Sequence, residues 1–372
     1  MASSTDPYAA AGVDTAAGDR AVELMKSAVR RTHGPEVLGG VGGFAGLFDA
    51  SALRGYDKPL LASSTDGVGT KVAIAQAIDK HDTIGRDLVG MVVDDIVVVG
   101  AKPLFMTDYI ACGKVVPERI ASIVHGIAAG CAETGTALVG GETAEHPGLL
   151  GVNDYDVAGA ATGVVEADRV LGAERVRTGD VVLALASSGL HSNGYSLVRH
   201  IVMGAGIQYA DNAAEFGTTW GEALLEPTRL YTTPLLQLVD ELPGSVHALS
   251  HVTGGGIAAN LARVLPQSAW VEVDRSTWTP PTVFQVLAER GHLDLVATEG
   301  TWNLGIGFLA VVDAASAEAA ASTLSARGIA TWQVGVVGGG TRPSTGSGTD
   351  GDWEQGAKGV DGGAVRLVGS YS

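Results

Sequence analysis

Short apolar stretches alternate with amphipathic ones along most of the chain from Pro59 onward. The runs 181–186 and 306–312 are apolar throughout and too short for typical helices, so we expect buried strands there. The stretch 118–133 instead repeats its isoleucines at helical spacing, which predicts one apolar helix face. Strands that alternate with helices in this way indicate an α/β fold.

The same pattern predicts the remaining elements. Asp19 can cap a first helix, because a carboxylate just before a helix accepts its free N–H groups. We expect helices at 20–31, 88–99, 118–133, 195–203, 228–242, 257–265, 282–290 and 314–328, and strands at 60–64, 104–111, 137–139, 157–165, 181–186, 270–273, 306–312 and 332–337.

The chain of 372 residues is long enough for two domains of ordinary size. Residues 1–19 are small and polar, and we expect them to be loosely ordered. The first domain should cover 20–169 and the second 170–337, since 170–180 carries no long apolar run. Gly, Ser, Thr and Asp dominate 338–372, which predicts a disordered tail.

The composition excludes several classes of protein. The net charge of −17 argues against a nucleic-acid binder and against anionic membranes. The longest apolar runs are far shorter than a membrane span, and the first residues lack a charged and then apolar pattern, so we expect no secretory signal. Cys112 and Cys131 form neither a CxxC motif nor a disulfide framework. We therefore expect a soluble, cytoplasmic protein.

Glycine accounts for 53 residues and is densest at 39–46. Bare backbone amides in such a run could bind a triphosphate, although a flexible turn explains the run equally well. A helical stretch precedes the run where a dinucleotide-binding fold needs a strand, and the chain has no GxxxxGK[ST] motif. A Rossmann fold and a P-loop are therefore not expected.

Carboxylates stand at three places where they could bind a metal ion. Asp66 lies in the turn-like run 64–71 after a predicted strand, together with Lys71. Asp94 and Asp95 interrupt an apolar stretch, where unpaired charges are costly. Glu142 follows another predicted strand. Mg²⁺ prefers such oxygen ligands, but a simple turn, an exposed helix face and a cap are the alternatives.

Two further motifs join a strand to the start of a helix in the second half. The first is 187–194, with His191, and the second is 251–256, a His-Val-Thr followed by three glycines. Free N–H groups at a helix start bind anions, and His191 could transfer a proton near pH 7, although a single histidine often has only a structural role. His247 and His251 lack the glutamate of HExxH, so zinc is not expected.

Taken together, these motifs resemble the phosphoribosylformylglycinamidine cyclo-ligase (AIR synthetase) family of purine biosynthesis. The similarity extends from about residue 8 to residue 337, in the family's order. It is carried by 8–14, 42–49, 65–71, 81–85, 103–105, 140–145, 186–199 and 251–256.

The resemblance implies a two-domain α/β fold in which the N-terminal domains of a homodimer close a central β-barrel. It also implies a ligase that uses ATP and Mg²⁺. ATP phosphorylates the amide oxygen of formylglycinamidine ribonucleotide, the amidine nitrogen attacks the activated carbon, and aminoimidazole ribonucleotide forms with release of ADP and phosphate. The alternatives are another ATP-using member of the superfamily and a non-catalytic nucleotide-binding protein.

The resemblance also suggests roles for individual residues. Ser192 and Asn193, with Thr253 and the three glycines after it, are expected on the substrate side. His191 and His251 are the acid–base candidates. The expected nucleotide contacts are Lys26, Gly40, Gly42, Gly43, Phe44, Asp66, Gly67 and Lys71, the expected metal ligands are Asp66, Asp94, Asp95 and Glu142, and the expected substrate contacts are Ser192, Asn193, Thr253, Gly254, Gly255 and Gly256.

The sequence departs from the family pattern in a few positions. An asparagine is common where Asp94 stands, so Asp95 is the more usual ligand of the two. His146 replaces a common methionine, and Trp302 a common phenylalanine. None of these changes removes a glycine or a carboxylate of the motifs.

Overall fold

A computed structural model of the protein describes residues 14–40, 42–343, 350–357 and 360–371. The segment 8–13, which carries part of the family resemblance, lies outside these residues, as does most of the N-terminal stretch expected to be loosely ordered.

The chain forms two compact units. The first comprises Met1–Ile96 and Pro103–Glu166, and the second comprises Val97–Lys102 and Ala167–Ser372. The division after Glu166 falls close to the boundary that the sequence suggested between residues 169 and 170.

A four-stranded sheet in the order β3-β6-β4-β5 is the centre of the first unit. Its strands are β3 (Pro59–Gly67), β4 (Lys102–Cys112), β5 (Ala137–Glu145) and β6 (Tyr155–Glu166). β3 pairs antiparallel with β6, whereas β4 and β5 run parallel through the crossover helix α5 (Pro117–Thr134). A parallel pair needs such a crossover, because a tight turn joins only antiparallel strands.

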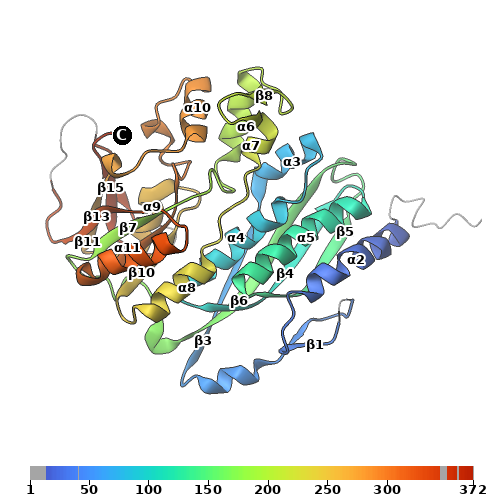
Figure 1. Cartoon of the computed structure of the whole chain (residues 1–372), viewed down its shortest axis with the longest axis horizontal. Coiled ribbons are helices and arrows are strands. Elements are labelled where there is room, and N and C mark those ends of the chain that lie inside the picture. The colour runs from blue at the N-terminus through green and yellow to red at the C-terminus, as the bar shows by residue number, and fades with distance from the viewer. Residues whose placement is uncertain (1–13, 41, 344–349, 358–359, 372) are drawn as a thin grey trace, which may run out of the picture. The chain divides into compact units, whose positions relative to one another are not determined.

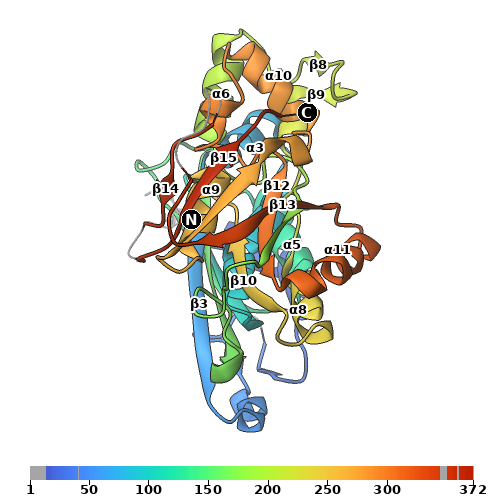
Figure 2. The same cartoon turned by 90° about the vertical axis from the view of Figure 1, so that its left-hand side faces the viewer.

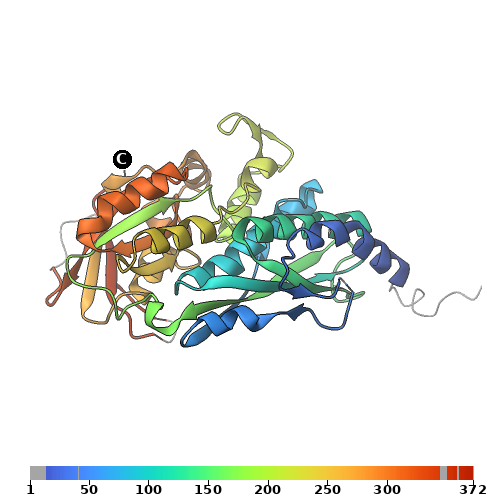
Figure 3. The ribbon, with the colours of Figure 1, turned by 60° about the horizontal axis from the view of Figure 1, so that its bottom comes forward.

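Helices cover one face of this sheet, namely α2 (Thr15–Arg30), α4 (Ile84–Val97) and α5, while α3 (Val72–Ile78) is short (Figures 1 and 3). Two glycines allow α4 and α5 to pack closely. A side chain at Gly85 would overlap the backbone of α5, and one at Gly126 would lie 2.6 Å from the carbonyl oxygen of Asp82.

The first helix begins earlier than the sequence suggested. Helix α2 starts at Thr15, and the Asp14 carboxylate accepts a hydrogen bond of 3.0 Å from the Ala17 amide. The prediction that Asp19 caps this helix is therefore wrong, because Asp19 already lies within its second turn. Residues 15–19 are helical rather than loosely ordered.

The second unit contains a seven-stranded sheet in the order β10-β12-β7-β13-β11-β15-β14 (Figure 2). Its strands are β7 (Val181–Ala186), β10 (Val246–His251), β11 (Ala269–Asp274), β12 (Ile306–Val312), β13 (Thr331–Gly339), β14 (Glu354–Gln355) and β15 (Ala364–Val368). A separate pair of strands consists of β8 (Asn212–Ala213) and β9 (Thr218–Thr219). The helices of this unit are α6 (Tyr195–Gly204), α7 (Trp220–Leu224), α8 (Thr232–Glu241), α9 (Gly256–Arg263), α10 (Thr282–Arg290) and α11 (Ala317–Ala326).

Both faces of this sheet are buried in hydrophobic cores. Along β7, Val182 and Ala184 point into one core, which includes residues of α9. Leu183 and Leu185 point into the other, which includes residues of α8 and α11. Alternate residues of a strand face opposite sides, so a strand covered on both sides is apolar throughout, as the sequence suggested for 181–186.

The prediction of a disordered tail at 338–372 is wrong for its described residues. Strand β13 extends to Gly339, and β15 pairs parallel with β11 from Trp270↔Ala364 to Asp274↔Val368. The side chains of Val365 and Leu367 belong to the core of the second unit. Tertiary pairing orders a segment whose composition alone suggested disorder.

Among the described residues, every helix is too short or too polar to span a lipid bilayer.

The helix predicted at 228–242 is shorter in the structure, because α8 covers only Thr232–Glu241.

Candidate functional site

A cavity of about 380 Å³ opens in the first unit between α2, the glycine run and strands β4 and β5. Gly40, Gly42 and Gly43 line one side of it, and Asp108 and Glu142 line another. The cavity therefore unites two motifs that the sequence identified separately, the glycine run and the Gly-Gly-Glu motif.

The glycine run forms the tip of a hairpin. Strands β1 (Val37–Leu38) and β2 (Leu47–Phe48) pair antiparallel on either side of it. Gly39 and Gly42 have φ angles of +88° and +105°, which side chains disfavour. Phe44, predicted to contact the nucleotide, is fully exposed and does not line the cavity. Val41 lies outside the described residues.

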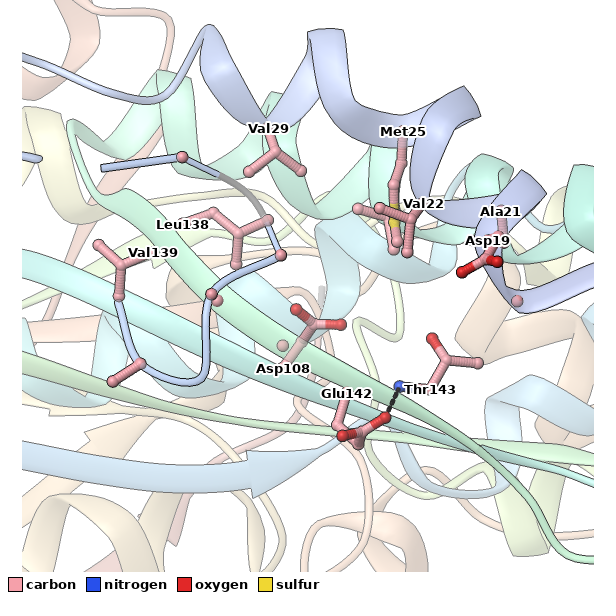
Figure 4. A pocket seen from close by; sticks show the side chains of 18 of the residues that line it. Asp19, Ala21, Val22, Met25, Val29, Asp108, Leu138, Val139, Glu142 and Thr143 are labelled. Carbon is pink, nitrogen blue, oxygen red and sulfur yellow. Dashed lines mark hydrogen bonds between the residues drawn. The ribbon is translucent and has the colours of Figure 1, made fainter. Parts of the chain in front are cut away.

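Asp108 is a cavity residue that the sequence analysis missed. Its carboxylate points from β4 into the space beneath α2 (Figure 4). Burial raises the pKa of Asp108 to about 7. Gly141 makes room for it, because a side chain there would overlap the carboxylate. Its spacing was the available signal. Asp108 lies two residues from each of the buried residues Met106 and Ile110, and therefore on the same face of the strand.

Glu142 and Asp66 both lie on strands rather than on turns. Glu142 is in β5, on the rim of the cavity, and its carboxylate accepts a 3.0 Å hydrogen bond from the Thr143 amide (Figure 4). Asp66 is in β3, exposed, and accepts a 2.7 Å hydrogen bond from the Gly67 amide. Asp66 and Gly67 do not line the cavity.

Lys71 and Asp94 are completely buried. The Lys71 ammonium forms a 2.8 Å ion pair with Asp87, whose side chain is also fully buried. The predicted contact of Lys71 with a phosphate does not fit this position. Asp94 is shielded from solvent inside α4, whereas the neighbouring Asp95 is half-buried. Of the two, Asp95 is the better placed to reach a metal ion.

Lys26 lies on α2 with one third of its side chain exposed, and it forms a 3.4 Å ion pair with Glu23. The neighbouring Met25 lines the cavity, but Lys26 does not. A lysine side chain is long and flexible, so this position leaves the predicted nucleotide contact open.

In the second unit the two predicted substrate motifs meet. A side chain at Gly254 would lie 3.6 Å from the Asn193 carboxamide oxygen. Gly254 is exposed, and the glycines end where α9 begins at Gly256. The buried Asn260, which the sequence analysis missed, donates a 2.8 Å hydrogen bond to the Gly256 carbonyl and so holds this turn. Free amides at a helix start favour an anion.

His191 and Ser192 lie beneath this surface. His191 is 1% exposed and has a left-handed backbone, with φ of +59°. Its Nε2 atom accepts a 3.2 Å hydrogen bond from the Ser188 amide. An acceptor nitrogen carries no proton, so Nε2 cannot act as an acid in this arrangement. The hydroxyls of Ser192 and Thr228 are 3.4 Å apart.

His251 is also buried, at 5% exposure, and stacks on Phe308 with ring centres 5.2 Å apart. The ring centre of Tyr231 lies 5.2 Å from that of Phe308 and 6.0 Å from that of His191. The two candidate acid–base residues therefore belong to one row of packed rings. This packing also fits a structural role for both residues, which is the alternative that the sequence left open for His191.

Among the described residues, one group of three side chains has ligand atoms close enough to hold a metal ion, namely Asp180, His247 and Asp313. None of these was a predicted ligand. Nδ1 of His247 lies 2.7 Å from the Asp180 carboxylate, which also accepts a 2.7 Å bond from the Arg177 amide. The Asp313 carboxylate accepts a 2.9 Å bond from the Ala315 amide, so local hydrogen bonds account for the group.

The fold resembles that of several solved proteins, at low sequence identity. Hydrogenase maturation protein HypE of E. coli gives a TM-score of 0.61 at 18% identity, covering 94% of each chain. Thiamine-monophosphate kinase of Stenotrophomonas maltophilia gives 0.60 at 18%, covering 85% of this chain and 94% of the other. These likenesses establish the shared fold.

Two family models match the chain. They describe the N-terminal domain of AIR synthase related proteins, over residues 48–165, and the C-terminal domain, over 177–346. The matched ranges fall in the two mixed α/β units. Because both domains of the family are present, the chain is an AIR-synthase-related protein.

Curated relatives narrow the class. A phosphoribosylformylglycinamidine cyclo-ligase of Thermosynechococcus vestitus is 48% identical over 331 residues, covering 89% of this chain and 96% of the relative. One of Alkaliphilus oremlandii is 45% identical with the same coverage, and one of a Geobacillus species is 50% identical over 83% of this chain and 88% of its own. The chain belongs to the phosphoribosylformylglycinamidine cyclo-ligase family.

Proposed function

We propose that this protein closes the imidazole ring of 5-aminoimidazole ribonucleotide from formylglycinamidine ribonucleotide, with conversion of ATP to ADP and phosphate. The observation that carries the proposal is identity of 45–50% to cyclo-ligases over most of both chains. The sequence motifs that supported the resemblance keep their glycines and carboxylates.

We place the nucleotide against the glycine run. Gly40, Gly42 and Gly43 line the cavity of about 380 Å³ beside it, and the bare backbone of such a run can bind phosphate oxygens through its N–H groups. Its opposite wall is apolar, with Val22, Met25 and other side chains, which suits a base or sugar face. Lys26 carries a positive charge on the same helix and follows the cavity residue Met25 in the chain.

Mg²⁺ would be held by carboxylates at the nucleotide. Asp66 and Glu142 are exposed and Asp95 is half-buried, so all three offer oxygen ligands of the kind that Mg²⁺ requires. They do not form a group of three converging ligand atoms. Such a group is not required, since Mg²⁺ usually binds to one or two carboxylates and to the substrate's phosphates. The bound ion would offset charge on the transferring phosphoryl group.

The substrate side of the proposal is the junction of Asn193 and Gly254. The N-terminus of α9 suits the 5′-phosphate of the ribonucleotide, and the Asn193 carboxamide beside it can donate or accept a hydrogen bond. Thr253 and Gly255 complete this surface, and Ser192 lies buried beneath it. His191, with Nε2 engaged by a backbone amide, serves here to shape the Ser187–Gly194 turn.

The chemistry requires two steps on one bound molecule. The amide oxygen receives the γ-phosphoryl group, because phosphate leaves more readily than hydroxide. The amidine nitrogen then attacks the same carbon, phosphate departs, and a proton leaves the nitrogen. Holding both ends of one substrate makes the closure unimolecular. The protein's main task is therefore to fix the ribonucleotide and to exclude water.

We further propose that the protein is a cytoplasmic homodimer whose N-terminal units together close a β-barrel. The sheet face opposite the helices carries Leu61 and Tyr109, which are 64% and 42% exposed. β3 is an edge strand of nine residues, and a long exposed edge favours pairing with another chain. A second copy would cover both features.

A direct assay tests the activity. Purified protein is given ATP, Mg²⁺ and formylglycinamidine ribonucleotide, and the aromatic amine product is measured by a diazo colour reaction. ADP and amine should appear in equal amounts. ADP without amine would favour another ATP-using activity of the superfamily, and nucleotide binding without ADP would favour a non-catalytic protein.

A further inference from the structure

One short segment supports both predicted substrate motifs of the second unit. A side chain at Gly256 would overlap the carbonyl oxygen of Glu299, and one at Gly194 would overlap the Trp302 ring. The buried Asn303 donates a 2.9 Å hydrogen bond to the Gly189 carbonyl. Segment 299–303 therefore packs against both turns, 187–194 and 253–256. The position of this segment determines the positions of the two turns.

Residues near the C-terminus contact segment 299–303 through Glu299. The Tyr371 hydroxyl donates a 2.6 Å hydrogen bond to Oε1 of Glu299. Arg275 donates to both carboxylate oxygens, at 2.6 and 2.9 Å, and its third nitrogen donates a 3.0 Å bond to the Gly369 carbonyl. The Arg275 side chain is fully buried, so this pair is shielded from competing water.

Several contacts fix the C-terminal segment up to Tyr371. Strand β15 is hydrogen-bonded to β11, and Arg366 forms a 2.9 Å bond to Glu272. The Tyr371 ring packs edge-on against Trp278, with centres 5.4 Å apart. This segment follows residue 346, where the match to the C-terminal family domain ends, so the domain model does not account for it.

We propose that segment 360–371 is a strap that positions the 253–256 turn for the ribonucleotide. Tyr371 and Glu299 are positioning residues in this proposal, since they act on the turn through the backbone of 299–303. The proposal rests on the substrate role assigned above to Thr253–Gly256. Loss of the strap should let the turn shift and weaken substrate binding without altering the nucleotide side.

Two conservative variants of the full-length protein test this. Tyr371→Phe removes only the hydroxyl that binds Glu299, and Glu299→Gln removes the charge that pairs with Arg275. Each should raise KM for the ribonucleotide about fivefold to tenfold, while kcat and KM for ATP stay within about twofold, since the lost interaction positions bound substrate. Hydrogen exchange at the amides of 254–257 should become faster in both.

Glu215→Gln is the matched control, because it weakens a 2.7 Å ion pair of the second unit, with Arg290, that makes no contact with the strap. It should leave KM for the ribonucleotide and the exchange at 254–257 unchanged. Unchanged KM and unchanged exchange in folded Tyr371→Phe and Glu299→Gln proteins would overturn the strap.

Thr253→Val separates the two proposals. If Thr253→Val raises KM for the ribonucleotide and the Tyr371 and Glu299 variants do not, only the strap fails. If Thr253→Val leaves KM unchanged, the substrate role of the turn fails, and the strap as stated fails with it. Faster exchange at 254–257 in the tail variants would then report a structural link without a role in binding.

Discussion

Lys71 and Asp87 form an ion pair of 2.8 Å in which both side chains are completely buried. Lys71 ends a single 3₁₀ turn at Gly69–Lys71, and Asp87 lies in the first turn of α4. Two charges taken out of water are stable only together, since either one alone keeps its full desolvation cost. The pair therefore fixes the end of the Thr-Asp-Gly-Val-Gly-Thr-Lys motif onto α4.

Lys71→Met should destabilise the first unit by about 3–5 kcal/mol, because it leaves Asp87 buried without its cation. The double variant Lys71→Met, Asp87→Leu should recover most of that loss. Urea unfolding followed by circular dichroism measures both. Lys80→Met is the control: its ion pair with Asp82 is exposed, so a change of less than about 1 kcal/mol is expected. Equal effects of the Lys71 and Lys80 variants would contradict the assigned burial.

Asp108 gives the second prediction, which concerns pH. The folded pKa of Asp108 is raised to about 7 by burial, above its ordinary value of 3.8. Between these values the folded state keeps a proton that the unfolded state has released. Stability is therefore lost as pH rises from about 4 to about 7 and is constant above that range. Asp108→Asn cannot ionise and escapes this loss.

The free energy of unfolding should consequently rise in Asp108→Asn relative to the parent at pH 8, by about 1–2 kcal/mol once partial exposure is allowed for. At pH 4 the difference should disappear. Urea unfolding at the two pH values provides the measurement. A difference that is the same at both would show that Asp108 titrates normally.

The sequence was most informative where local signals agree. The bounds of β7, α10 and β12 were predicted correctly to the residue. Helix α10 follows two prolines and ends before Gly291, so local chemistry marks both ends. β7 and β12 are apolar throughout because each is covered on both faces, and that pattern is visible without the fold.

The features that were missed depend on residues far apart in the sequence. β15 is a strand because it pairs with β11, about ninety residues earlier, and nothing in its composition indicates that partner. Lys71 looked like a phosphate ligand because its burial against Asp87 depends on the packing of α4. Asp108 was overlooked because one carboxylate in a strand has no recognisable motif around it.

The third prediction concerns Asp66. Asp66→Asn should reduce turnover by at least about a hundredfold while the fold is retained, because it removes an exposed negative ligand and no core volume. The asparagine oxygen can still accept the bond from the Gly67 amide. Steady-state amine formation and a melting curve are the measurements. Asp168→Asn, at another exposed position, should be fully active; near-normal activity of Asp66→Asn would remove Asp66 from the metal site.

The fourth prediction concerns the proposed dimer. Leu61→Asp places a charge on the open face of the β3–β6–β4–β5 sheet, where the side chain is 64% exposed in a single chain. If a second copy covers this face, the charge should convert the dimer to monomers in sedimentation velocity at micromolar concentration. Met203→Asp, at an exposed position of α6, should leave the dimer intact. An unchanged sedimentation coefficient for Leu61→Asp would exclude this face as the interface.

The last prediction compares one substitution at two glycines of the same turn. Gly256 has a φ of +70°, and a side chain there would overlap the Glu299 carbonyl oxygen, so Gly256→Ala should destabilise the second unit by more than about 3 kcal/mol. Gly254 is exposed, and an added methyl group would make only an ordinary 3.6 Å contact with Asn193. Gly254→Ala should therefore keep its melting temperature yet raise KM for the ribonucleotide about tenfold, because the methyl group occupies the surface proposed for the phosphate. Unaltered KM in Gly254→Ala would move the substrate elsewhere, whereas normal stability in Gly256→Ala would contradict the packing of 299–303 against α9.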